Sequence, residues 1–265
     1  MVIAQNFSKP AEQLFREGKL KLDRWKCAWN SDWIRDARQT LPAYVHFPFN
    51  TSRHGLEKAD WSAVRAVMDE TGTPFVNIHL VAFPEEFPEE DCDSAVLDSF
   101  VQCLSELSEV FGPDKVIAEN VVARANGKLS RVAAVKPEII SRALEKTGCG
   151  LLLDTAHLGI TCQEQNWDPT STLDAMPLVR LKELHVTGSA VRNGIIMDSM
   201  PMTFEDWMLP VEVIWRIRNE VVPAPWLCAL EYGGVGEIFE WRSEPEVMIR
   251  DNGELCDHLA SIHQT

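Results

Sequence analysis

Short apolar runs alternate along the chain with longer segments in which apolar residues recur every three or four positions. Short runs rich in Val, Ile and Leu are typical of buried β-strands, and the longer spacing is typical of amphipathic helices. The predicted strands are Val2–Asn6, Trp25–Trp29, Ala43–Phe49, Phe75–Leu80, Val116–Val121, Gly150–His157, Leu181–Val186 and Trp226–Tyr232. Eight strands that alternate with helices predict an α/β protein with the (β/α)8 TIM barrel fold.

The segments between the strands predict an outer ring of helices. Pro137 suits the first turn of one of these helices, and Gly148 suits the position just after its end. We find no linker and no low-complexity tract, so we predict one domain over residues 1–265. The predicted helices are Pro10–Phe15, Ser31–Arg38, Asp60–Glu70, Asp93–Val110, Lys136–Lys146, Phe204–Asn219 and Glu244–Ser261.

Composition and charge exclude several classes of protein to which the chain could belong. The chain has 45% hydrophobic and 25% charged residues, which is typical of a globular protein. Its formal net charge of −15 repels phosphate backbones, which disfavours broad, unspecific binding of nucleic acid and leaves open only a local basic groove. No apolar run approaches the roughly 20 residues that span a bilayer, so we expect no membrane insertion. Seven cysteines form no CxxC pair and no leader pattern precedes them, which predicts a cytoplasmic protein with reduced thiols.

Acidic residues and histidines stand at the ends of most of the later predicted strands. A (β/α)8 barrel carries its active site at the carboxyl ends of its strands, so these side chains should converge. A single histidine in a strand is more often a hydrogen-bonded core residue than a ligand, but a series at successive strand ends predicts a metal site. Imidazole with carboxylate suits zinc, manganese or iron. The residues are His46, His79, Glu119, Asp154, His157, His185 and Glu231.

At these residues the chain resembles the xylose-isomerase-like TIM barrel superfamily. The resemblance is carried by Glu119-Asn120, by Asp154-Thr155-Ala156-His157, and by His185 and Glu231 in the same order. The superfamily includes sugar isomerases and epimerases, endonuclease IV and, more distantly, multinuclear non-haem iron oxidases. In the isomerases and epimerases the resemblance implies one metal, commonly manganese, on Glu119, Asp154, His185 and Glu231.

The resemblance to endonuclease IV implies a larger set of ligands that would hold three zinc ions. It adds His46, His79, His157 and Asp198 to the four residues above, and His46-Phe-Pro-Phe-Asn50 is similar to that enzyme's third-strand segment. The chain departs from the pattern at Met200, where the endonuclease has a histidine two residues after its aspartate. The departure puts a third metal in doubt, so the resemblance allows one to three ions of Mn, Fe or Zn.

The leading hypothesis is a metal-dependent isomerase or epimerase of a small sugar or polyhydroxy-carbonyl compound. Glu119 and Glu231 would transfer the proton through an enediolate that the metal stabilises. The alternatives are a multinuclear iron oxidase acting on a cysteine-containing peptide or small molecule, a zinc phosphodiesterase, and a silent barrel that only binds.

Contacts with substrate are expected from loop residues and from the residue after Glu119. A small-molecule substrate suits most of these functions, whereas the resemblance to the oxidases implies a peptide partner. We also consider a homodimer, because apolar barrel exteriors often pair. The predicted substrate-binding residues are Asn50, Arg53, Asn120 and Arg192.

Overall fold

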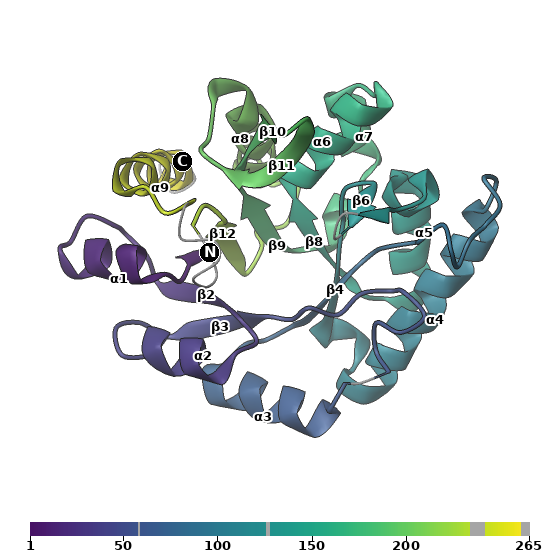
Figure 1. The fold of residues 1–265 in the computed structure, drawn as a ribbon, viewed down its shortest axis with the longest axis horizontal. Helices are drawn as coiled ribbons and strands as arrows, with labels where there is room; N and C mark the ends of the chain where they lie inside the picture. The colour runs from purple at the N-terminus through teal and green to yellow at the C-terminus, as the bar shows by residue number, and fades with distance from the viewer. Residues whose placement is uncertain (58, 126–127, 234–241, 261–265) are drawn as a thin grey trace. The chain divides into compact units, whose positions relative to one another are not determined.

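The computed structural model describes residues 1–57, 59–125, 128–233 and 242–260 (Figure 1). Eight parallel strands alternate with helices along the chain, and the fold is the predicted (β/α)8 class. The eight strands are β1 (Val2–Asn6), β2 (Arg24–Ala28), β3 (Ala43–His46), β4 (Val76–His79), β5 (Val116–Glu119), β8 (Gly150–Asp154), β9 (Leu181–Val186) and β12 (Leu227–Leu230).

Seven of the helices in the described ranges match the predicted outer ring, and two, Thr155–Gln165 and Pro169–Ala175, were not predicted. None of the helices in the described ranges is both long enough and apolar enough to cross a membrane. The helices are α1 (Lys9–Arg16), α2 (Ser31–Ala37), α3 (Trp61–Thr71), α4 (Asp93–Phe111), α5 (Pro137–Thr147), α6 (Thr155–Gln165), α7 (Pro169–Ala175), α8 (Phe204–Arg218) and α9 (Pro245–Ala260), with 3-10 turns at Pro113–Lys115, Val132–Val135 and Leu178–Arg180.

The chain divides into two compact units. Unit 1 comprises Met1–His46 and Glu183–Thr265, and unit 2 comprises Phe47–Lys182. The prediction of one domain over residues 1–265 stays a prediction.

Unit 1 contains a parallel sheet in the order β3-β2-β1-β12-β9. Its core includes Ala4, Tyr44, Leu227 and Ala229, with Trp226 packed against them. Alternate residues of a strand share one face of a sheet, so the residues two positions after Tyr44 and Ala229, which are His46 and Glu231, continue that face beyond the core. Figure 1 shows α1 and α9 side by side in this unit.

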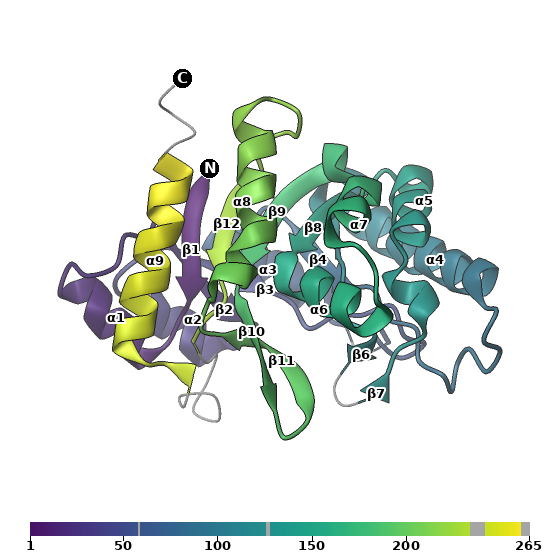
Figure 2. The ribbon, with the colours of Figure 1, turned by 90° about the horizontal axis from the view of Figure 1, so that it is seen from above.

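Unit 1 also contains an antiparallel hairpin that we did not predict. Strands β10 (Gly188–Arg192) and β11 (Ile195–Met200) form it, and Figure 2 shows the hairpin extending beyond the start of α8. At its tip Asn193 and Gly194 both have positive φ, of 51° and 75°. An Asn-Gly pair with this backbone is the preferred two-residue hairpin turn, because its twist matches that of the flanking strands.

Unit 2 contains the strand order β8-β5-β4 with α3 to α7 and a short hairpin, β6 (Arg124–Ala125) with β7 (Lys128–Leu129). Figure 1 shows α4 and α5 side by side. Helix α5 begins at Pro137, and Gly148 ends it with a left-handed φ of 77°, as the sequence predicts. A left-handed residue at this position favours glycine because glycine has no Cβ.

Two predicted strands run three residues past the observed ends. The third strand was predicted to run from Ala43 to Phe49, but β3 ends at His46. The sixth strand was predicted to run from Gly150 to His157, but β8 ends at Asp154 and α6 begins at Thr155. The Asp154 side chain accepts a hydrogen bond from the backbone N–H of His157 at 2.8 Å and thereby caps the helix. Aspartate at this position satisfies an N–H group that has no partner within the helix. His157 therefore lies in the first turn of a helix and not at a strand end.

Candidate metal centre

Three of the predicted ligands stand at the carboxyl ends of neighbouring strands in unit 2. His79 ends β4, Glu119 ends β5 and Asp154 ends β8. His79 and Glu119 are register partners, and His79 Nε2 lies 3.1 Å from Glu119 Oε2. Glu119 is 2% exposed and Asp154 is 0% exposed. Parallel strands thus bring an imidazole and two buried carboxylates to one edge of their sheet, as predicted.

His157 joins this group from the first turn of α6. Its Nδ1 lies 3.6 Å from Glu119 Oε1 and 3.7 Å from Asp154 Oδ2. Glu119, Asp154 and His157 each offer a ligand atom, and the three atoms lie within 4.8 Å of one another. Because carboxylate and imidazole are common ligands of transition metals, these three residues are a candidate metal site. We call these three residues together with His79 the unit 2 cluster.

Backbone carbonyls orient both imidazoles of the unit 2 cluster. His79 Nδ1 lies 2.7 Å from the carbonyl oxygen of Phe49, and His157 Nδ1 lies 2.9 Å from that of Asn120. A carbonyl oxygen can only accept, so in both rings Nδ1 carries a proton, and in the neutral imidazole Nε2 is the nitrogen that can bind a metal. A metal-binding histidine is typically held in this way, because the bond at one nitrogen fixes the tautomer and the ring for the other.

Asn120 has a positional role that the sequence did not indicate. Its amide nitrogen donates to the carbonyl oxygen of Asp154 at 2.9 Å, and its amide oxygen accepts from the backbone N–H of Asp154, also at 2.9 Å. The side chain is 3% exposed. It therefore ties the end of β5 to the end of β8 and fixes the backbone of Asp154. Its predicted contact with substrate stays a prediction.

A second group of predicted ligands comes together in unit 1. His185 lies in β9 and Glu231 follows β12, and His185 Nδ1 is 3.0 Å from Glu231 Oε1. The ring of His46, which ends β3, lies 5.3 Å from the ring of His185 between centroids. We call His46, His185 and Glu231 the unit 1 cluster.

Two residues that we did not single out contact the unit 1 cluster. Glu183 Oε1 lies 2.7 Å from His185 Nε2 and accepts a hydrogen bond from it, while His185 Nδ1 lies on the side of Glu231. Lys26 is 6% exposed and forms an ion pair with Glu231. A signal was present for both residues. Each is a charged residue within a predicted strand, and Glu183 stands two positions before His185, on the same face.

The other predicted site residues lie in neither cluster. Asp198 is in β11, and its carbonyl oxygen accepts from Arg242 Nη1 at 3.2 Å. Within the described ranges, no group of close ligand atoms includes Asp198. Arg192 and Arg53 are exposed. The Asn50 side chain accepts from the backbone N–H of Ser52, and its backbone pairs with His79. The assignments of these four residues stay predictions.

Comparison with known proteins gives a family and a fold. A family model described as "RiPP precursor modification enzyme MbnB/TglH/ChrH" matches residues 51–221. A UPF0276 protein of Chromobacterium violaceum is 24% identical over 173 residues, which are 63% of this chain and 59% of that protein. The match thus spans about three fifths of the length of this relative.

Solved structures of two barrels share the fold over the whole chain. A D-tagatose 3-epimerase-like protein has a TM-score of 0.64 at 15% identity, and the match covers 100% of this chain and 99% of that one. The IolI protein with a bound zinc atom has a TM-score of 0.65 at 11% identity, and the match covers 100% of both chains. At these identities the similarity shows the xylose-isomerase-like barrel fold alone.

Proposed function

Because the chain belongs to the MbnB/TglH/ChrH family of RiPP precursor modification enzymes, we propose that it oxidises a cysteine-containing peptide at a multinuclear iron centre. A RiPP is a ribosomally synthesised and post-translationally modified peptide. The family match supports the peptide as substrate. It favours the oxidase alternative over the isomerase that led the sequence analysis.

One observation in the unit 2 cluster carries the proposal. The simplest isomerase set needs neither His79 nor His157, yet a backbone carbonyl holds Nδ1 of each ring and leaves Nε2 for a metal. Glu119 lies close to both rings, with its two oxygens directed to different histidines. This arrangement supports a centre with more ligands than one metal of an isomerase requires.

The donor set fits a transition metal. Glu119 and Asp154 are buried carboxylates, and a buried carboxylate is costly unless a cation or hydrogen bonds compensate it. Glu119, Asp154, His157 and His79 would hold metal in unit 2, and His185, Glu231 and His46 are the corresponding donors in unit 1. Iron bound to such donors supplies redox chemistry and Lewis acidity.

In each unit, neighbouring residues hold these metal-donor residues in place. Asn120 fixes the backbone of Asp154 through two hydrogen bonds. Glu183 accepts a hydrogen bond from His185 Nε2, and Lys26 pairs with Glu231. Because these contacts are made by buried side chains, each donor is held in place before a ligand arrives.

The test compares two sets of synthetic peptides, one with a single cysteine in each peptide and one with serine in its place. Protein purified without oxygen and loaded with iron(II) should consume oxygen with cysteine peptides only. The mass of the cysteine peptides should change, and that of the serine peptides should not. Oxygen uptake is followed with an electrode and peptide mass by spectrometry. Equal uptake with both sets would show that the cysteine is not the reacting group and would contradict the proposal.

A sugar isomerase or epimerase is the second candidate. The contact between His185 and Glu231, and the burial of Glu119 and Asp154 in their own unit, are compatible with the four-ligand set of that reaction. Such an enzyme would exchange the α-proton of a ketose with solvent deuterium, and loss of either Glu119 or Glu231 would stop the exchange. Exchange by manganese-loaded protein, without oxygen uptake, would favour this candidate over the oxidase.

A further inference from the structure

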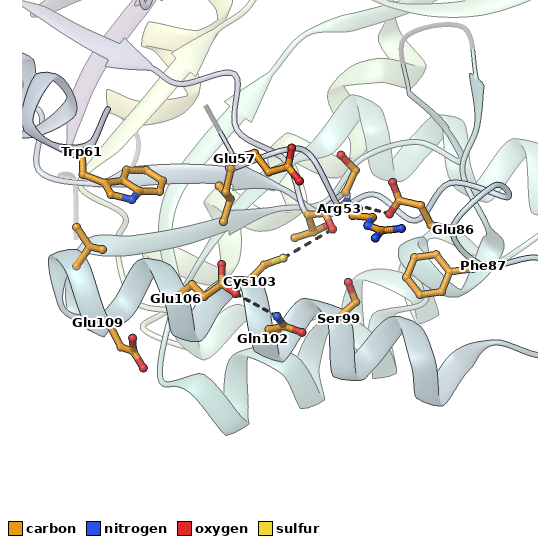
Figure 3. A pocket seen from close by; sticks show the side chains of 14 residues that line it. Arg53, Glu57, Trp61, Glu86, Phe87, Ser99, Gln102, Cys103, Glu106 and Glu109 are labelled. Carbon is orange, nitrogen blue, oxygen red and sulfur yellow. Dashed lines mark hydrogen bonds between the residues drawn. The ribbon is translucent and has the colours of Figure 1, made fainter. Parts of the chain in front are cut away.

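A cavity of about 570 Å³ lies in unit 2 (Figure 3). The segment after β3, the start of α3, the segment after β4 and one face of α4 form its walls. This volume is in the range of sites that hold a ligand larger than one side chain. Neither the metal ligands nor the family match assigns a role to this cavity.

The cavity has an excess of negative charge. Glu57, Glu86, Glu106 and Glu109 line it, and Figure 3 shows that the last two come from α4. Arg53 is the one positively charged residue among the fourteen that line the cavity, and its backbone N–H donates to Glu86 at 3.0 Å. Because a cleft lined by charges of one sign concentrates ligands of the opposite sign, this cavity fits a cationic ligand.

The rest of the lining is apolar or neutral. Leu56, Trp61, Phe87 and Val110 contribute hydrophobic surface. Burial raises the pKa of the Cys103 thiol to about 11, so Cys103 is uncharged at neutral pH and is a weak nucleophile. Lys and Arg side chains combine a long apolar stem with a charged end, and an apolar wall with carboxylates around it fits both parts.

The cavity is connected to the unit 2 cluster through one residue. Thr51 lines the cavity, and its backbone N–H donates to the carbonyl oxygen of His79 at 3.0 Å. Its hydroxyl group donates to the carbonyl oxygen of Val81 at 2.8 Å. Cys103 Sγ in turn lies 3.8 Å from the carbonyl oxygen of Thr51. A peptide bound in the cavity would therefore contact Thr51, which is hydrogen-bonded to the strand that carries His79.

We infer that this cavity binds a segment of the peptide substrate that carries at least two Lys or Arg residues. The inference rests on the proposed function for the identity of the ligand as a peptide. The segment lies with its cationic groups at the four glutamates and its aliphatic stems on the apolar wall. The cavity thus selects a substrate by charge at a distance from the reacting residue.

Binding of a labelled peptide tests the inference without any turnover. The probe is a fluorescein-labelled twelve-residue peptide of alternating Lys and Leu, and its binding is followed by fluorescence anisotropy. The pocket variant Glu106→Lys/Glu109→Lys should raise its Kd at least tenfold, because both positions line the cavity. The matched control is Asp69→Lys/Glu145→Lys, which changes the net charge equally at exposed positions away from the cavity. The control should raise the Kd by less than threefold.

Two outcomes would overturn the inference. An equal loss of affinity in both double variants would mean that the peptide follows the overall negative charge and not the cavity. Displacement of the probe by spermidine at the same concentration as by unlabelled peptide would assign the cavity to a small polyamine.

The result is separable from the proposed function. If the wild-type protein binds the probe at the cavity but never oxidises cysteine peptides, the inference about the cavity stands and the oxidase proposal is wrong. If the wild-type protein oxidises cysteine peptides but both double variants bind the probe like wild type, the oxidase proposal stands and the inference about the cavity is wrong.

Discussion

Replacing Glu119 with glutamine should weaken metal binding in unit 2 by a factor of at least about 100 and abolish oxidation of cysteine peptides. Glu119 lies within reach of both His79 and His157, so its carboxylate contacts both imidazoles of the unit 2 cluster. The amide is uncharged and a poor ligand, and loss of residues that merely orient metal ligands already weakens binding about 10–100-fold. Calorimetric titration of the metal-free protein with Zn²⁺ as the probe metal measures the change.

Two further variants serve as a comparison and a control for Glu119→Gln. Asn120→Ala removes the two hydrogen bonds that fix the backbone of Asp154 but no ligand, so we expect a smaller loss of about tenfold. Glu145→Gln alters an exposed residue of α5 and should bind metal like wild type. If Glu119→Gln bound Zn²⁺ as tightly as Glu145→Gln, the unit 2 cluster would not be a metal site.

Replacing Glu231 with glutamine should reduce the free energy of unfolding of the metal-free protein by about 3 kcal/mol. Glu231 forms an ion pair with Lys26, and both side chains are buried. The substitution removes the negative charge of the buried pair and keeps the buried ammonium group of Lys26, and breaking a buried pair at one end is more destabilising than removing the whole pair. For a domain of this size the melting temperature should fall by roughly 6–12 °C. Urea unfolding followed by circular dichroism measures the free energy.

A surface pair provides the matched control. Glu212 and Arg216 form an ion pair one turn apart on α8, where the Glu212 side chain is 40% exposed. Glu212→Gln should therefore change the free energy of unfolding by less than about 1 kcal/mol. The double variant Lys26→Met/Glu231→Leu should be more stable than Glu231→Gln, because it removes both buried charges. Equal stability of Glu231→Gln and Glu212→Gln would show that the ion pair between Lys26 and Glu231 is not a buried, stabilising pair.

The sequence predicted the strand ends well because they depend on local pattern. Apolar runs that end in a charged residue or a histidine located His79, Glu119 and Asp154 at the ends of β4, β5 and β8. The predicted sixth strand runs past Asp154 because Ala156 extends the apolar pattern of Leu151–Leu153. Asp154 as the cap of a helix was a readable signal for the correct boundary. The β10–β11 hairpin was missed although Asn193-Gly194 is a strong turn signal.

The orientation of the donors could not be predicted from sequence. Which nitrogen of His79 keeps its proton depends on the carbonyl of Phe49, which is 30 positions away in the sequence. The pairing of Lys26 with Glu231 joins residues that are more than 200 positions apart. Sequence pattern gives the chemical type of such residues and the strand that carries them. Their partners depend on tertiary packing.

The proposed multinuclear iron centre is best tested by measuring the metal content of wild-type protein purified without oxygen. Elemental analysis by mass spectrometry, with protein measured by amino-acid analysis, gives the number of ions of each metal per chain. We expect iron as the main metal, at two or more ions per chain. One manganese ion per chain without iron, or no bound metal at all, would contradict it.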